Sequence, residues 1–111
     1  MSEPFNKLTP AQAERLAMLS EECGEVIMAI GKILRHGYDS IHPDQQGTPP
    51  EFRYTNRKAL SYEVKDVIAV ASALAHEGEI DLKDADGPYS EKAFRIWQKK
   101  LRYTHHQGVV A

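Results

Sequence analysis

A nine-residue stretch at positions 19–27, Leu-Ser-Glu-Glu-Cys-Gly-Glu-Val-Ile, constrains the fold of this chain more than any other. At the three-and-four spacing of a helix, the apolar residues in and around it fall on one stripe, as in a helix that buries one face. The residues of this stripe are Leu16, Leu19, Cys23, Val26, Ile30 and Leu34. The sequence therefore predicts a core helix whose buried face includes Cys23.

Two carboxylates lie beside this stripe. Glu22 and Glu25 are three residues apart, which on a helix separates their Cβ atoms by only about 5 to 6 Å. Such a pair alone is typical of a solvated surface. Next to an apolar stripe the two charges repel each other unless a cation lies between them, and a divalent ion is one that fits.

The same pattern returns 41 positions later. Glu63 and Asp66 correspond to Glu22 and Glu25, again on one shoulder of an apolar stripe. Two such helices packed antiparallel through their stripes would direct four carboxylates into one space. Four anionic oxygen donors favour a hard ion, Mg²⁺ or Mn²⁺, over zinc. A di-iron centre in a helical bundle generally uses Glu-x-x-His on two helices, and the sequence has no such motif.

The two acidic segments also carry a family resemblance. Residues 21–25 read EExxE and residues 63–66 read ExxD, a pair that resembles the motifs of the MazG-like, all-α nucleoside triphosphate pyrophosphohydrolases. The similarity covers roughly residues 12 to 76, and residues 37–55 look inserted relative to the family. It implies Mg²⁺-dependent cleavage, with Mn²⁺ as an alternative ion, between the α and β phosphates of a nucleoside triphosphate. The products would be a nucleoside monophosphate and pyrophosphate.

The resemblance also suggests roles for individual residues. Glu22, Glu25, Glu63 and Asp66 are the expected metal ligands, and Glu21 is expected to orient or deprotonate the attacking water. Lys32 and Arg35, two to three turns further along the first helix, are candidate phosphate contacts. Basic residues late in the chain can meet substrate phosphates in the family. The best placed residues here are Lys99, Arg102 and Tyr103.

Helix boundaries can be predicted from capping residues. Thr9 and Gln12 form a capping box around Pro10, and the first helix should then run to about His36 and stop at Gly37. Thr55 or Asn56 should begin a second helix that ends near His76. Ser90 should cap a third helix, with Trp97 and Leu101 on its apolar line, and residues 104–111 should form a loose tail.

Residues 37–55, between the two long helices, form a predicted surface loop. Pro43, Gly47, Pro49 and Pro50 exclude a long helix here. A loop of this length in a small domain is often functional. Its aromatic residues would either fold over a ligand or pin the loop to the helices, and the sequence does not decide between these alternatives. They are Tyr38, Phe52 and Tyr54.

The whole chain of 111 residues suits one all-α domain, residues 1–111. We expect a MazG-like antiparallel helical bundle of two long core helices and a C-terminal helix, completed as a homodimer or homotetramer. A net charge of −2 gives no indication of nucleic-acid binding. The single cysteine excludes disulfide staples and favours a cytoplasmic location, and no apolar run is long enough to span a membrane.

Three functions follow from these observations as alternatives. The first is a nucleotide pyrophosphohydrolase that removes unwanted or surplus nucleotides. The second is a non-catalytic helical oligomerisation or regulatory module whose acidic shoulders bind a basic partner or no ligand. The third is the same hydrolytic fold with a specialised substrate, such as a phosphoribosyl nucleotide or a deoxynucleotide.

Overall fold

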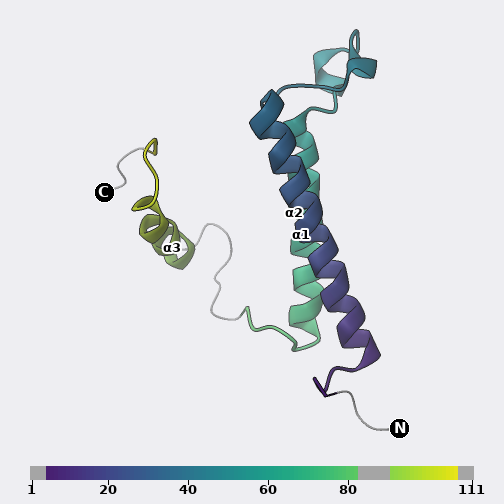
Figure 1. Cartoon of the computed structure of the whole chain (residues 1–111), viewed down its shortest axis with the longest axis vertical. Coiled ribbons are helices and arrows are strands. Elements are labelled where there is room, and N and C mark those ends of the chain that lie inside the picture. Colours follow the sequence, from purple (N-terminus) through teal and green to yellow (C-terminus); the bar gives the residue numbers. More distant parts are fainter. Residues whose placement is uncertain (1–4, 83–90, 108–111) are drawn as a thin grey trace. The chain divides into compact units, whose positions relative to one another are not determined.

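The computed structural model describes residues 5–82 and 91–107, and these residues form α-helices, short 3₁₀ helices and connecting turns without any β-strand (Figure 1). The predicted all-α class is therefore confirmed for the described residues. The chain divides into two compact units, Met1–Glu79 and Ile80–Ala111, and each is described by itself. Within the described ranges, no helix combines the length and the apolar character needed to cross a membrane.

The first helix, α1, spans Pro10–His36. Thr9 caps its start: the Thr9 hydroxyl accepts a hydrogen bond from the Gln12 backbone, and the Gln12 side chain accepts one from the Thr9 backbone. The predicted capping box is therefore present. Gly37 ends the helix at φ 89°, ψ 167°, a positive φ that glycine adopts without a steric cost.

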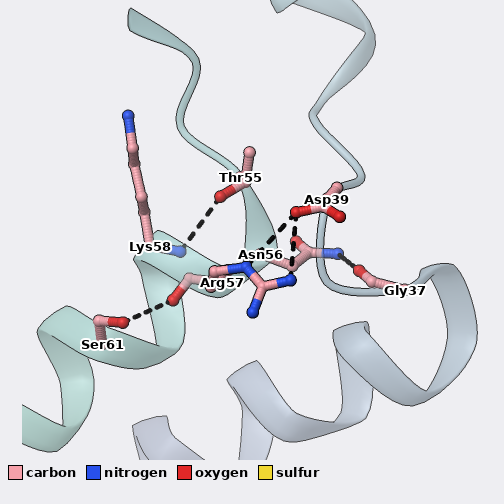
Figure 2. A network of polar contacts seen from close by, with 7 residues as sticks. All are labelled: Gly37, Asp39, Thr55, Asn56, Arg57, Lys58 and Ser61. Carbon is pink, nitrogen blue, oxygen red and sulfur yellow. Dashed lines mark hydrogen bonds and ion pairs between the residues drawn. The ribbon is translucent and has the colours of Figure 1, made fainter. Parts of the chain in front are cut away.

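The second long helix, α2, spans Asn56–His76 and is capped by the Thr55 hydroxyl, which accepts a hydrogen bond from the Lys58 backbone (Figure 2). The loop between α1 and α2 contains two short 3₁₀ helices, Pro43–Gln45 and Pro50–Phe52. Each begins at a proline, whose fixed φ suits a first helical position. Gly78, two residues after the end of this helix, has φ 74°.

Contacts at both ends show that α1 and α2 run in opposite directions (Figure 1). At one end, the Asn56 side chain donates to the Gly37 carbonyl oxygen at 3.1 Å (Figure 2). At the other end, the Arg15 guanidinium binds the Glu79 carboxylate through two contacts of 2.7 Å each. These two sets of contacts join the start of each helix to the end of the other.

Residues seven apart on α1 form the line that faces α2. Arg15 and Glu22 are half-buried on this line, and Ala29 is buried at 7% exposure. Beside it runs a second line of half-buried residues, Leu19, Val26 and Ile33. Two adjacent lines with a seven-residue repeat are the contact pattern of two helices wound along one another.

This contact face corrects the predicted stripe. Leu19 and Val26 are half-buried as expected, but Cys23 is exposed, which makes its predicted burial wrong. The other three stripe residues are also exposed: Leu16 at 43%, Ile30 at 41% and Leu34 at 82%. The physical reason is that α1 turns its Glu22 line toward α2, so the far flank of the stripe has no covering helix within this unit.

The second unit contains α3, Glu91–Leu101. Its apolar residues Phe94, Ile96 and Trp97 are between 43% and 53% exposed. The predicted cap, Ser90, lies outside the described residues, as do residues 83–89 of the connector and 108–111 of the predicted tail. Residues 102–107 form turns and bends without regular helix. The prediction of a single domain over 1–111 stays a prediction.

Replacing Arg15 with alanine should lower the melting temperature at neutral pH. The Arg15 guanidinium holds the pKa of Glu79 below its ordinary value, chiefly through their hydrogen bonds. A lowered folded-state pKa gives stability that is present above the ordinary value of 4.5 and lost as the pH falls through the folded value. Thermal unfolding at pH 6 and at pH 2.5 checks this, since wild type and variant should differ at the first pH and converge at the second.

Candidate metal centre

Four carboxylates from the two long helices meet at the contact between them. Glu22 and Glu25 of α1 and Glu63 and Asp66 of α2 each offer an oxygen, and these oxygens all lie within 4.8 Å of one another. Glu22, Glu25 and Glu63 are half-buried and Asp66 is exposed. The structure thus brings together all four residues that the sequence predicted as metal ligands, within one chain.

Local sequence places these side chains. Glu22 lies on the same seven-residue line as Ala29, so it faces α2 directly, and Glu25 follows three residues later on the adjoining side. On α2, Glu63 precedes the half-buried Val67 by four residues and the fully buried Leu74 by eleven. The contact between α1 and α2 that buries Ala29 and Leu74 therefore also brings the four carboxylates close together.

Two oxygens in this cluster lack a partner. Glu22 Oε2 and Glu63 Oε2 are buried and accept no hydrogen bond from the described residues. No lysine, arginine or histidine of the described chain forms an ion pair with any of the four carboxylates. An unsatisfied buried acceptor is costly. A hard divalent cation bound by carboxylate oxygens would remove that cost, so the donor set fits Mg²⁺ or Mn²⁺.

Crowding raises the pKa of two of these groups. The pKa of Glu63 is raised first by its hydrogen-bonding interaction with Glu25, then by burial and by the neighbouring negative charges. The pKa of Glu22 is raised first by burial, then by the charges of Glu25, Asp66 and Glu21. Without a cation, the folded state therefore favours a proton within the cluster.

The metal-free protein should become more stable as the pH is lowered from 7.5 to 4.5. An acid whose folded pKa is raised contributes its full stability below the ordinary value of 4.5, and this stability is lost as the pH rises through the raised pKa. Glu79 acts in the opposite sense only below 4.5, outside this window. Thermal unfolding in EDTA measures the trend.

The matched variant for this trend is Glu22→Gln combined with Glu63→Gln. It removes both titrating groups and keeps their shape, so its melting temperature should change less between pH 4.5 and 7.5. An equal slope in wild type and double variant would show that the cluster does not couple to folding.

Glu21 precedes the cluster and is exposed. Its negative charge contributes to the raised pKa of Glu22. Its carboxylate, however, is not one of the four that converge. The structure therefore places this predicted catalytic residue beside the cluster and open to solvent.

A pocket of about 500 Å³ lies under the loop that follows α1. The predicted phosphate contacts Lys32 and Arg35 line it, and neither side chain has an ion-pair or hydrogen-bond partner among the described residues. Several other lining residues were not among those predicted from the sequence. These are His36, His42, Gln45 and Asn56. The sequence marked these residues only by their position in, or next to, a long polar loop.

The loop aromatics have distinct positions. The Tyr54 ring stacks on Tyr62 of α2, with centroids 6.0 Å apart and planes 17° apart. The Arg57 guanidinium lies 4.6 Å from the centroid of Tyr38, and Phe52 is 73% exposed. Tyr38 and Tyr54 thus attach the loop to α2, as one alternative predicted. Tyr54 also lines the pocket, which keeps the ligand-covering alternative open for this residue.

The other predicted substrate-binding residues lie in the second unit. Lys99 is on α3, and its carbonyl oxygen accepts a hydrogen bond of 3.1 Å from Arg102 Nε. The Arg102 guanidinium lies 5.6 Å from the centroid of the Tyr103 ring. These three residues are brought together with one another, and their contact with substrate stays a prediction.

Comparisons with protein-family models, with curated proteins and with solved structures give no match to this chain. The resemblance to MazG-like pyrophosphohydrolases therefore depends on the two acidic motifs. The convergence of those motifs in the folded chain is an independent observation, and it is the one on which a functional proposal can be built.

Proposed function

We propose that this protein is a Mg²⁺-dependent nucleotide pyrophosphohydrolase that cleaves nucleoside triphosphates between the α and β phosphates. The observation that carries the proposal is the meeting of Glu22, Glu25, Glu63 and Asp66, with two buried oxygens that no described residue satisfies. Surface carboxylates that serve only solubility do not need to converge from two helices at a buried contact.

In this proposal, the four carboxylates would hold Mg²⁺, an ion that proteins usually bind through a few carboxylates together with water and substrate phosphates. Bound Mg²⁺ supplies charge neutralisation at the phosphate oxygens and lowers the pKa of water. Glu21, exposed beside the cluster, accepts the proton of the attacking water. Lys32 and Arg35 bind phosphate oxygens with their unpaired cationic groups.

Lys99, Arg102 and Tyr103 complete the substrate contacts in this proposal. All three are exposed and two are cationic, so they can approach phosphates without displacing a described ion pair. A homodimer or homotetramer would complete the helical bundle around the site.

The direct test is a screen for pyrophosphate release from common and modified nucleoside triphosphates, with Mg²⁺ and with excess EDTA. At least one nucleotide should yield its monophosphate and pyrophosphate in equal amounts, and only with the divalent ion. Release of orthophosphate alone, or an equal rate in EDTA, would contradict the proposal. A panel that includes deoxynucleotides and phosphoribosyl nucleotides separates a broad enzyme from a specialised one.

A second candidate function is helical association, and the exposed flank of α1 favours it. Leu16, Cys23 and Ile30 are seven residues apart and all exposed, a line of the kind that packs against another helix. Only Ala29 and Leu74 are buried hydrophobic residues in the described chain, so this unit alone has little core.

Replacement of Ile30 with glutamate should therefore shift the protein toward monomer at a fixed concentration. A charge on this line would have to be buried in any interface that uses it. Met28 is also exposed, at 66%, but it is not on this line, so Met28→Glu is the matched control. Light scattering coupled to size-exclusion chromatography reports the mass, and an equal mass for all three proteins would exclude this flank as an interface.

A further inference from the structure

The pocket under the loop has the chemistry of a nucleoside site. We propose that it binds the base and sugar of the nucleotide, so that the loop over residues 37–55 determines which nucleotides are accepted. The inference rests on the proposed function for its ligand class, a nucleotide, but the binding it claims can be measured without any turnover.

Position connects the pocket to the carboxylate cluster. Lys32 follows Glu25 by seven residues, so it lies two turns and about 10 Å along the same side of α1. On α2, Ala59 lines the pocket and precedes Glu63 by four residues, about one turn. The pocket thus begins within one or two turns of the cluster on both helices. A nucleotide held by its phosphates at the cluster extends past Lys32 into it.

The volume agrees with a small organic ligand. A pocket of about 500 Å³ lies within the range of roughly 300 to 1,000 Å³ that small-molecule sites occupy. Apolar walls are provided by Ile41, Pro43 and Ala59. A site for inorganic phosphate alone would need neither this volume nor these walls.

Tyr54 offers a fixed aromatic surface. Its ring is held against Tyr62 by stacking, and its backbone N–H donates to Gln45 Oε1 at 2.6 Å. The residue nevertheless remains 46% exposed and lines the pocket. A base can stack on an aromatic ring of this kind, and such stacking makes a large contribution to nucleotide affinity.

Two amides supply hydrogen-bonding groups with a set orientation. Gln45 uses its oxygen to accept from Tyr54, and Asn56 uses its nitrogen to donate to the Gly37 carbonyl (Figure 2). The other polar atom of each side-chain amide has no hydrogen-bond partner among the described residues. In Gln45 this atom is a donor, Nε2, and in Asn56 it is an acceptor, Oδ1. Bases are read by such donor and acceptor pairs.

The test is calorimetric binding of the four common nucleoside 5′-monophosphates and of ribose 5-phosphate, in EDTA, to the full chain. At least one monophosphate should bind about tenfold or more tightly than the base-free sugar phosphate, because base stacking on one aromatic side chain has an effect of this size.

Tyr54→Leu should weaken monophosphate binding about tenfold and leave ribose 5-phosphate binding unchanged, whereas Tyr54→Phe should retain most of the affinity. Phe52→Leu is the matched control, because Phe52 is on the same loop, is 73% exposed and does not line the pocket. Equal losses in the Tyr54→Leu and Phe52→Leu variants, equal affinity for ribose 5-phosphate, or no binding of any monophosphate would overturn the inference.

The outcomes for pocket and enzyme are separable. Tyr54-dependent binding in a protein that releases no pyrophosphate would support the pocket and refute the proposed hydrolysis. Pyrophosphate release with no Tyr54-dependent binding would support the hydrolysis and refute the pocket as the nucleoside site.

Discussion

Replacement of Glu63 with glutamine is expected to lower Mg²⁺-dependent pyrophosphate release by at least about a hundredfold. Loss of a group that merely orients a metal ligand typically costs 10-fold to 100-fold in metal affinity or activity, and Glu63 is proposed as a ligand itself. It also contributes one of the two buried oxygens that lack a partner. Initial rates of pyrophosphate release at saturating Mg²⁺, compared with wild type, measure the effect.

Glutamine keeps the shape of the side chain, so this variant should fold. Removing one negative charge from the cluster should even raise the melting temperature of the metal-free protein at neutral pH, because Glu63 is crowded by three carboxylates. Glu51→Gln, on the exposed surface of the loop, is the control and should retain wild-type activity. A Glu63→Gln enzyme with near wild-type rates would remove this residue from the catalytic centre.

Addition of Mg²⁺ is expected to raise the melting temperature of the wild-type protein by about 10 °C at a free concentration near 100 times its dissociation constant. An ion that binds only the folded state then stabilises it by about 2.7 kcal/mol. For a domain of about this size, each kcal/mol changes the melting temperature by roughly 4 °C.

The shift should be specific to the cluster. In Glu22→Gln combined with Asp66→Asn, Mg²⁺ should change the melting temperature by no more than the equivalent ionic strength of NaCl does. Differential scanning calorimetry at fixed ionic strength provides the comparison. A similar Mg²⁺ shift in wild type and double variant would mean that the ion acts elsewhere on the chain or only as a screening salt.

The helix ends were predictable because their causes are local. Thr9, Gln12 and Thr55 satisfy backbone groups within three residues of themselves, and glycine at position 37 provides a positive φ. The meeting of the carboxylates was also predictable, since two helices with the same pattern bring matching shoulders together when they pack in opposite directions.

The buried face of α1 was less predictable. A helix with apolar residues over a wide arc does not show which part of that arc faces a helix of its own chain. Here Glu22 and Ala29 face α2, and Cys23 and Leu34 do not. Amphipathic spacing measures the width of the apolar surface and leaves its partner undefined.

Contacts between residues that are far apart in the sequence could not be predicted from it. Arg15 and Glu79 are 64 residues apart, and nothing in the spacing of either charge marks its partner. The pocket depends in the same way on where the loop returns to α2. Tyr54 stacks on Tyr62 and Asn56 binds Gly37 only in the folded hairpin, so the lining residues could be read from the structure alone.

Titration calorimetry with Mn²⁺ tests the central proposal most directly. Wild-type protein should bind the ion saturably at neutral pH with a defined stoichiometry, and Glu22→Gln combined with Glu63→Gln should show no saturable heat while retaining its helical circular dichroism spectrum. Saturable binding of equal affinity in the double variant, or no binding in wild type, would contradict a divalent-ion site at this contact between α1 and α2.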